Sequence, residues 1–509
     1  MQYILAHDLG TSGNKATLYA LDGTLKGSLV CDYPIYYPFS GAVEQNADDW
    51  WRAVCDSTKQ LLEQTGISAP EVACACFSAQ MMGCLIVDKN NVPLRPMLIW
   101  ADTRSSVQEK YMTERAGMEN GYKITGHRLS ASYSAAKLLW IRDNEPELYA
   151  KAAKMLHAKE YIIYKLTGEI VTEYSDASGT NLLDINKKEW SQELLSAFGI
   201  PRSLLPDIYP SAHIAGKVTA EAARLCGLPE GTPVVIGGGD GSCACVGAGV
   251  VKAGKVYNVV GSSSWISTAS EKPVFDPEMR TFNWFHLDDS LYTPCGTMQA
   301  AGYSYAWFRD ALCGEQGYAG FVAGVSAYKL IDKLVEYTEP GANGLLFLPY
   351  LLGERSPLWD HNARGAFVGL GITSGKGDMA RAILEGVGFN LKTILNILEK
   401  DSPADEIVMI GAGVKGDVWL QILSNIWQKP LLVPAYLEEA TSMGAAICGG
   451  VGIGAYKDFS VAETLNKPVR RIEPDKSTAD IYKKLYKIFR DTYVQLKPIY
   501  QSLAEAAHN

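Results

Sequence analysis

The feature that most constrains the fold of this chain is a strand, a glycine-containing turn and a second strand, which occur twice about half a chain apart. The first copy reads YILAHDLG and KATLYALDG, separated by TSGN at residues 11–14. The second reads KVYNVV and WISTAS, separated by GSSS at residues 261–264. Apolar β-formers on both sides of a short turn of Gly and small polar residues predict a β-hairpin. This internal echo predicts a duplicated fold of two lobes, 1–248 and 249–509, with the boundary in the Gly/Ala-rich stretch 248–254.

In the rest of the chain, sequence patterns typical of strands alternate with patterns typical of helices. A helical pattern starts at Asn46 with acidic residues in its first turn, and the strand-like run VACACFSA follows it. Residues 478–501 form an amphipathic pattern with Ile481, Leu485, Ile488 and Leu496 on one apolar side. Strands that alternate with helices predict an α/β protein.

The composition excludes several classes of protein. Of the 509 residues, 47% are apolar and 20% are charged, which is typical of a globular chain and not of a disordered or fibrous one. The net charge of −9 disfavours general binding to nucleic acid. The N-terminus lacks the basic start and apolar core of a signal peptide, and no uncharged apolar run reaches about 18 residues, so we expect a cytoplasmic protein without membrane contact. The 11 Cys show no C-x-x-C pair and predict buried free thiols in a reducing compartment.

The first hairpin turn carries residues that suit a phosphate. Gly10 lets the backbone approach a ligand closely, and Thr11 and Ser12 can donate hydrogen bonds to it. Lys15 can neutralise the phosphate charge, and Asp8 can hold a magnesium ion through water. An ordinary hairpin turn has the same kind of local sequence, so this turn alone does not decide between a phosphate site and a turn without a ligand.

Asp240 stands in a second glycine-rich turn, GGGDGS at residues 237–242, directly after the strand-like run TPVVI. Glycines on both sides leave its carboxylate open to a ligand, and a carboxylate placed there can take a proton from an attacking hydroxyl. Asp is also common in glycine-rich turns that bind nothing. Two further turns have the same character, the one at 261–264 and the G-A-G run at 411–413.

Between the first two turns lies a cluster of polar residues and Met: Gln80, Met81, Met82, Trp100, Asp102 and Arg104. An indole ring can cover the apolar face of a sugar while the polar groups fix its hydroxyls. A structural Asp–Arg pair at a strand end explains part of the same cluster. The chain has no G-x-x-x-x-G-K-[ST] loop and no G-x-G-x-x-G opening a first βαβ unit, which argues against a P-loop enzyme and a Rossmann dehydrogenase.

Taken in order, these residues resemble the FGGY family of carbohydrate kinases, from Tyr3 to Leu465. Two long family patterns are present: SYSAAKLLWIRDN at 132–144, and GAFVGL followed after seven residues by DMARAILE, over 365–385. The resemblance implies two actin-like, ribonuclease-H-like lobes with ATP and a sugar in the cleft between them.

The resemblance also implies a role for each turn. Asp240 is implied to be the general base and a sugar contact, and Asp8 to hold magnesium through water. The other implied sugar contacts are the six residues of the polar cluster. The implied ATP-binding residues are Gly10, Thr11, Ser12 and Lys15 in the first turn, Gly261, Ser262 and Ser263 in the turn at 261–264, and Gly411, Ala412, Gly413 and Asn425 around the adenosine.

The identity of the sugar is less constrained. Xylulose-type members carry Met-His-Gly after the Gln, whereas Met82 takes the place of that His here and cannot hydrogen-bond a hydroxyl in the same way. The Arg-Glu pair of glycerol-type members is absent. The run Trp100-x-Asp102-x-Arg104 fits both the xylulose-like and the gluconate-like branches. We expect ATP-dependent conversion of D-xylulose to D-xylulose 5-phosphate, with a gluconokinase or another pentulose or polyol kinase as the alternative.

A sugar sensor that binds ATP without catalysis is the non-enzymatic alternative, and a chaperone-like ATPase is a second. Intact Asp8 and Asp240 favour the enzyme. The base rate of symmetric assemblies favours a homodimer. In the run GERSPLWD, we expect Glu354, Arg355 and Asp360 to brace the cleft without touching the ligand.

Overall fold

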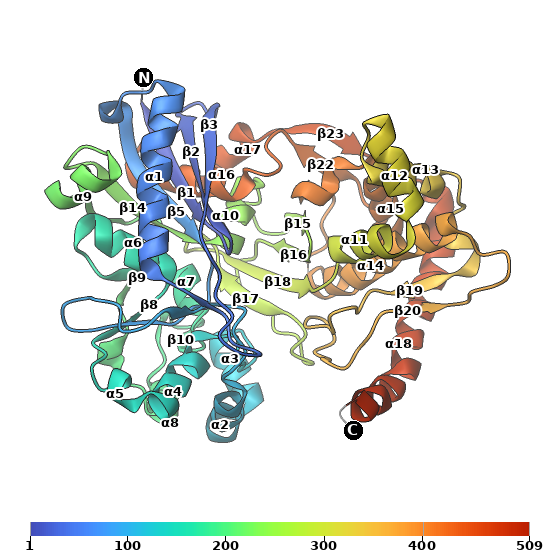
Figure 1. Cartoon of the computed structure of the whole chain (residues 1–509), viewed down its shortest axis with the longest axis horizontal. Coiled ribbons are helices and arrows are strands. Elements are labelled where there is room, and N and C mark those ends of the chain that lie inside the picture. The colour runs from blue at the N-terminus through green and yellow to red at the C-terminus, as the bar shows by residue number, and fades with distance from the viewer. Residues whose placement is uncertain (1, 401, 508–509) are drawn as a thin grey trace.

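The computed structural model describes residues 2–400 and 402–507, and it is built around two large mixed sheets (Figure 1). The first sheet has the strand order β13 (Ile214–Lys217), β14 (Pro233–Gly239), β5 (Val72–Ala79), β1 (Tyr3–Leu9), β2 (Gly13–Ala20) and β3 (Leu25–Asp32). The second has the order β17 (Phe282–Phe285), β18 (Tyr292–Met298), β16 (Ser264–Thr268), β15 (Val256–Val260), β21 (Ile407–Ile410), β22 (Leu431–Pro434) and β23 (Pro468–Ile472).

The two sheets repeat one pattern of pairing, which confirms the predicted duplication. In the first, β1 pairs antiparallel with β2 and parallel with β5, and β5 pairs parallel with β14. In the second, β15 pairs antiparallel with β16 and parallel with β21, and β21 pairs parallel with β22. Each run of parallel strands ends at an antiparallel strand, β13 or β23. The two predicted hairpins therefore open equivalent sheets, and the predicted α/β fold of two ribonuclease-H-like lobes is confirmed.

Helices cover each sheet with apolar faces. On the first sheet, α1 (Ala47–Thr65) starts at its N-cap Asn46, as predicted, and buries Trp50, Val54 and Leu61 against β2 and β3. The helix α6 (Ala158–Thr167) packs against β5 and β14 of the same sheet. On the second sheet, α14 (Lys376–Leu398) packs against β16 and β18 and against α15 (Asp417–Trp427).

Two helices join the lobes. The helix α10 (Asp240–Gly247) follows β14 of the first sheet, and α16 (Ala440–Gly452) follows β22 of the second. They cross in close contact, because a Cβ atom on Gly444 would lie 1.9 Å from the carbonyl oxygen of Cys243. Beyond the crossing, α16 packs against β1, β5 and β14, so this part of the C-terminal half lies on the first sheet (Figure 1).

The predicted lobe boundary at 248–254 falls between α10 and β15. The boundary remains a prediction as a division into domains, since α16 belongs to 249–509 by sequence and to the first lobe by packing. The predicted lobe ends, residues 1 and 509, lie outside the described residues.

The C-terminal helix α18 (Ala479–Ala507) forms where the amphipathic pattern predicts it. Two residues of the predicted apolar side, Leu485 and Leu496, pack against the core, whereas Ile481 and Ile488 are 41% and 49% exposed. The most deeply buried side chains of the helix are aromatic: Tyr482, Phe489, Tyr493 and Tyr500.

All 11 cysteines are free thiols, and all but Cys31 are buried, as predicted. Within 2–400 and 402–507, no helix combines the length and the apolar character that crossing a membrane requires.

Candidate functional site

The carboxyl ends of three neighbouring strands bring the predicted carboxylates together. Asp8 on β1 is in register with Ser78 on β5, and Ser78 is in register with Gly238 on β14. Asp240 follows one residue after β14 ends and is the first residue of α10. The carboxyl ends of parallel strands lie at the same edge of a sheet, so Asp8 and Asp240 share that edge, where α10 begins.

The environment of Asp240 makes its carboxyl a weaker acid than an ordinary Asp. Burial raises its pKa to about 7, and repulsion from Asp8 acts in the same direction. The backbone N–H of Gly241, which donates to Oδ1 of Asp240 over 2.7 Å, opposes the shift. A carboxylate whose pKa lies near neutrality is a better proton acceptor than an ordinary Asp, while half of the molecules still hold it ionised at pH 7.

Asp8 has one free oxygen. Its Oδ1 accepts a hydrogen bond of 2.9 Å from Ser78 Oγ, and within 2–400 and 402–507 its Oδ2 accepts none. Burial raises the pKa of Asp8, opposed by the Ser78 hydrogen bond and by the charge of Lys15. A carboxylate oxygen without a protein partner fits a water ligand of a magnesium ion.

The first hairpin turn is tied to the predicted sugar residues. Trp100 Nε1 donates to Thr11 Oγ1 over 2.9 Å. Gln45 Nε2 donates to the carbonyl of Thr11 over 2.6 Å, and Gln80 Nε2 donates to Gln45 Oε1 over 2.7 Å. Oε1 of Gln80 is buried without a partner among the described residues. Gln45 was missed by the sequence analysis, because an amide side chain before a helix carries no motif.

Lys15 reaches across to the other lobe. Its Nζ donates to the carbonyl of Glu438, in the segment before α16, over 2.7 Å. The side chain is half-buried. Lys15, which is predicted to bind a phosphate, is therefore held where β2 meets the C-terminal half of the chain.

The predicted turns at 261–264 and 411–413 lie together at one edge of the second sheet. Gly411 follows β21, which pairs with β15, and Cβ atoms on Gly411 and Gly413 would lie 2.7 and 2.9 Å from the carbonyl oxygen of Val260. The helix α11 (Gly302–Leu312) starts on the tip of the hairpin, where the N–H of Gly302 donates to the carbonyl of Gly261 over 3.0 Å. These turns, with Ser262, Ser263 and Ala412 inside them, form one glycine-rich surface.

Asn425 lies inside α15 and has partners within its own lobe. Its Oδ1 accepts hydrogen bonds from Gln421 Nε2 and from the N–H of Asp475. Its predicted contact with the adenosine remains a prediction.

An apolar wall adjoins the turn that carries Asp240. A Cβ atom on Gly239 would lie 2.4 Å from Met81 Sδ, so Met81 packs directly on that turn. Tyr257 donates to the carbonyl of Gly241 over 2.7 Å and accepts from Trp265 Nε1 over 3.1 Å. The wall consists of Met81, Tyr133, Phe282, Trp284 and Cys295, with Met82, Trp265 and Trp359 packed against them.

Asp102 and Arg104 have their partners inside the protein. Asp102 is fully buried, and its carboxylate accepts from the N–H of Val43 over 2.7 Å and pairs with Arg104 over 2.8 Å. Arg104 also pairs with Glu44 over 2.8 Å and stacks on the ring of Trp140. Asp102 and Arg104 therefore brace this part of the protein. The predicted contact of these two residues with a sugar remains a prediction.

In GERSPLWD, two of the three polar residues brace the lobe. Glu354 accepts hydrogen bonds from the N–H of Gln299 and from Asn390 Nδ2, and burial raises its pKa to about 8. Asp360 accepts from the hydroxyl of Tyr493 over 2.8 Å.

Arg355 differs from them, because its guanidinium forms no ion pair among the described residues and lies 5.9 Å from the ring centroid of Trp359. Arg128 lies over the same ring at 5.1 Å and is equally without an ion pair in 2–400 and 402–507. Trp359 is held in the left-handed region, with φ of 52°, and its buried Nε1 has no partner among the described residues. A bulky residue in this conformation is strained. Arg128 was not among the predicted site residues, because nothing in its local sequence sets it apart.

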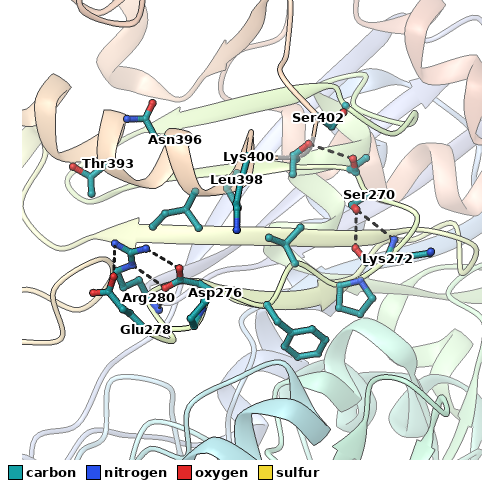
Figure 2. Close-up of a pocket in the computed structure, with 18 of the residues that line it drawn as sticks. Ser270, Lys272, Asp276, Glu278, Arg280, Thr393, Asn396, Leu398, Lys400 and Ser402 are labelled. Atoms are coloured by element: carbon teal, nitrogen blue, oxygen red, sulfur yellow. Dashed lines mark hydrogen bonds and ion pairs between the residues drawn. The ribbon is translucent and has the colours of Figure 1, made fainter. Parts of the chain in front are cut away.

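A cavity lies elsewhere, between the β16–β17 connection, the end of α14 and α18 (Figure 2). Its volume is about 890 Å³. Its labelled lining mixes Lys272, Lys400 and Arg280 with Asp276 and Glu278, and Arg280 pairs with both acids. Because side chains of both charges line this cavity, its lining does not indicate one class of ligand, and none of the predicted site residues is part of that lining.

The comparisons with known proteins agree with the geometry. Models of the N-terminal and C-terminal domains of the FGGY family of carbohydrate kinases match residues 3–247 and 256–453. A xylulose kinase from Bacillus subtilis (strain 168) is 32% identical over 512 residues, which cover 100% of both chains. A gluconokinase from Bacillus licheniformis is 32% identical over 504 residues, which cover 99% of this chain and 98% of that one. The ligand-bound crystal structure of a xylulose kinase from Lactobacillus acidophilus matches with a TM-score of 0.92 and 27% identity, over 99% of this chain and 100% of that one.

Proposed function

Because this chain belongs to the FGGY family of carbohydrate kinases, it is a sugar phosphotransferase, and we propose that it converts D-xylulose and ATP to D-xylulose 5-phosphate and ADP. The full-length similarity to xylulose kinases supports this choice of sugar. The observation that carries the mechanism is Asp240, a carboxylate with a pKa of about 7 at the edge of the first sheet, beside Asp8.

In this mechanism, Asp240 accepts the proton of the terminal sugar hydroxyl while that oxygen attacks the γ-phosphorus of ATP and the bond to the β-phosphate oxygen breaks. Met81 and the neighbouring apolar wall cover one side of the turn that carries Asp240. We assign the hydroxyls of Thr11, Ser12, Ser262 and Ser263 in the two hairpin turns to the charge that spreads over the phosphates, since the N–H groups of Gly10 and Gly261 donate within their own turns.

Asp8 supports this charge balance through its free oxygen, which we propose as the acceptor for a water of a magnesium ion. Magnesium supplies positive charge against the triphosphate when it is bound. Lys15 adds a second positive charge, and its bond to the Glu438 carbonyl couples the first turn to the segment before α16.

Gluconate is the second candidate sugar, and the two arginines on Trp359 favour it. A neutral pentulose leaves Arg128 and Arg355 without an ion pair among the described residues, whereas a sugar acid offers a carboxylate to them. The similarity to a gluconokinase supports the same candidate. Met82, which stands where a hydrogen-bonding His would favour xylulose, is compatible with either sugar.

A kinase assay with D-xylulose, gluconate, D-ribulose and glycerol, run on the wild type, Arg355→Met and Arg364→Met, separates the candidates. Arg364 is the matched control, because it lies in the same segment and bonds only to carbonyl groups. If D-xylulose is the substrate, it is the best of the four sugars and Arg355→Met keeps most of its kcat/KM. If gluconate is the substrate, Arg355→Met lowers kcat/KM for gluconate at least tenfold, while Arg364→Met does not. No turnover of any sugar contradicts the proposed reaction.

A further inference from the structure

A buried network of charged and polar side chains lies behind the turn that carries Asp240. It consists of His157, Lys159, Glu173, Ser175 and Asp176, and each is at most 1% exposed. The first two residues stand at the start of α6, Glu173 ends β9 (Val171–Glu173), and the last two lie in α7 (Tyr174–Ser178). Burying charges costs free energy unless they are paired and hydrogen-bonded, so such a network calls for an explanation.

Glu173 is the centre of this network. Its Oε1 accepts from Lys159 Nζ over 2.8 Å, from Ser175 Oγ over 2.7 Å and from the N–H of Asp176 over 2.8 Å. Its Oε2 accepts from the N–H of Ser175 over 2.7 Å and from Ser211 Oγ over 2.8 Å. Five donors hold this carboxylate in one orientation.

The fixed carboxylate determines which way the Ser175 hydroxyl points. A carboxylate can only accept, so Ser175 Oγ must give its proton to Glu173 and turn its lone pairs elsewhere. They accept the backbone N–H of Gly239 over 2.9 Å. Gly239 is the N-cap of α10 and directly precedes Asp240.

The turn needs such an anchor, because its three glycines have no side chains of their own to hold it. Gly237 has a φ of 78°, and the conformational freedom of glycine lets this segment adopt many other shapes. On one side Met81 packs on Gly239, and on the other Ser175 Oγ lies 3.1 Å from the place of a Cβ atom on Gly238. The N–H of Gly237 donates to the Ser211 carbonyl over 3.0 Å, and β14 pairs with β5 up to Gly239, so the Ser175 hydrogen bond is the side-chain contact that completes the polar anchoring of the turn beside Asp240.

Resting on the proposed role of Asp240 as base, we propose that Ser175, held by Glu173 and Lys159, is a positioning residue that fixes Asp240 for proton transfer through the amide of Gly239. A displacement of about 1 Å at a reacting group can cost up to a hundredfold in rate, so one hydrogen bond at this point has catalytic weight. The same network lies close enough to act on Asp240 by charge, because Asp176 adds to the rise of the Asp240 pKa.

The network is not a metal site. His157, Glu160 and Asp176 converge closely enough to hold a cation, but the Lys159 ammonium already lies 3.3 Å from Asp176 Oδ2. Asp176 Oδ1 in turn accepts from His157 Nδ1 over 2.7 Å. The Lys side chain thus supplies the positive charge that a metal would bring.

The test compares Ser175→Ala with Ser178→Ala. Ser178 is the matched control, because it is a buried serine of the same helix whose Oγ donates to the Ser175 carbonyl over 2.6 Å without touching the turn. Ser175→Ala should lower kcat at least tenfold and change KM for the sugar and for ATP less than threefold, whereas Ser178→Ala should leave kcat within about twofold. Ser175→Cys, whose sulfur is a weak acceptor, should recover part of the lost kcat.

Amide hydrogen exchange of residues 237–241 gives a second measurement that does not need the reaction. Exchange at Gly239 should become at least tenfold faster in Ser175→Ala and stay unchanged in Ser178→Ala. Equal kcat values or equal exchange rates in the two variants overturn the positioning role. A wild type that phosphorylates no sugar overturns the proposed function instead, and the exchange comparison still decides whether Ser175 anchors the turn.

Discussion

Replacing Gly444 with Ala tests the crossing of α10 and α16, where the two lobes meet. The added Cβ atom would lie 1.9 Å from the carbonyl oxygen of Cys243 and 2.7 Å from its carbonyl carbon. Both atoms belong to the backbone, so no side chain can rotate away, and the helices must separate by about 1.5 Å to reach ordinary van der Waals contact. The opposite contact, a Cβ on Gly247 at 1.7 Å from the Ala440 carbonyl oxygen, prevents a simple rotation.

The cost follows from two opposing effects. Overpacking costs about 1–3 kcal/mol, and a clash between two backbones lies at the upper end of that range. Ala gains about 1 kcal/mol over Gly inside a helix. We therefore expect a net loss of about 2 kcal/mol, which corresponds to a fall of roughly 4–8 °C in the Tm of a domain of 150–250 residues.

Gly317→Ala is the matched control, because this glycine lies inside the helix α12 (Gly314–Ala323) and nothing is within 4 Å of its Cβ position. Thermal unfolding followed by circular dichroism should show a lower Tm for Gly444→Ala and an equal or higher Tm for Gly317→Ala. A Gly444→Ala protein that melts within about 1 °C of the wild type would refute the close crossing.

Three further predictions concern the site. Because Asp240 must be ionised to act as base, kcat/KM should fall about tenfold per pH unit below its pKa of about 7 and level off above it. Asp8→Asn removes a negative neighbour, so it should move this acidic limb of the pH–rate profile to lower pH. Asp102→Asn breaks a fully buried ion pair with Arg104 and should lower the unfolding free energy in urea by about 3 kcal/mol, whereas a loss below about 0.5 kcal/mol would contradict the bracing role. Met82→His adds a group that can hydrogen-bond a hydroxyl, and it should raise the ratio of kcat/KM for D-xylulose to that for gluconate; an unchanged ratio would place residue 82 away from the sugar.

The parts of the fold that local patterns determine could be predicted from the sequence. Both hairpins, the start of α1 after Asn46 and the burial of the cysteines follow from periodicity and turn residues, which act over a few positions. The duplication of the fold followed from the spacing of the hairpins, whereas the strand order of each sheet is seen only in the structure.

Features that depend on distant partners could not be predicted. Lys159 is fully buried only because Glu173 and Asp176 surround it, and a Lys in a helix is otherwise typical of a solvated face. In the same way, Gln45 joins the site through the Thr11 carbonyl, and Arg128 joins it through Trp359. The aromatic residues of α18 were also missed, since the predicted apolar side was defined by aliphatic residues, of which only Leu485 and Leu496 pack against the core.

The most direct test of Asp240 as the base of a sugar kinase is the turnover of Asp240→Asn on the sugar that the wild type prefers, measured beside its affinity for ATP. Loss of a positioned general base costs about 10²–10⁴-fold in rate, so we expect kcat to fall at least a hundredfold while ATP still binds. Asn has nearly the shape of Asp and keeps an acceptor for the Gly241 amide, so the fold should remain intact. A kcat within tenfold of the wild type would contradict the account.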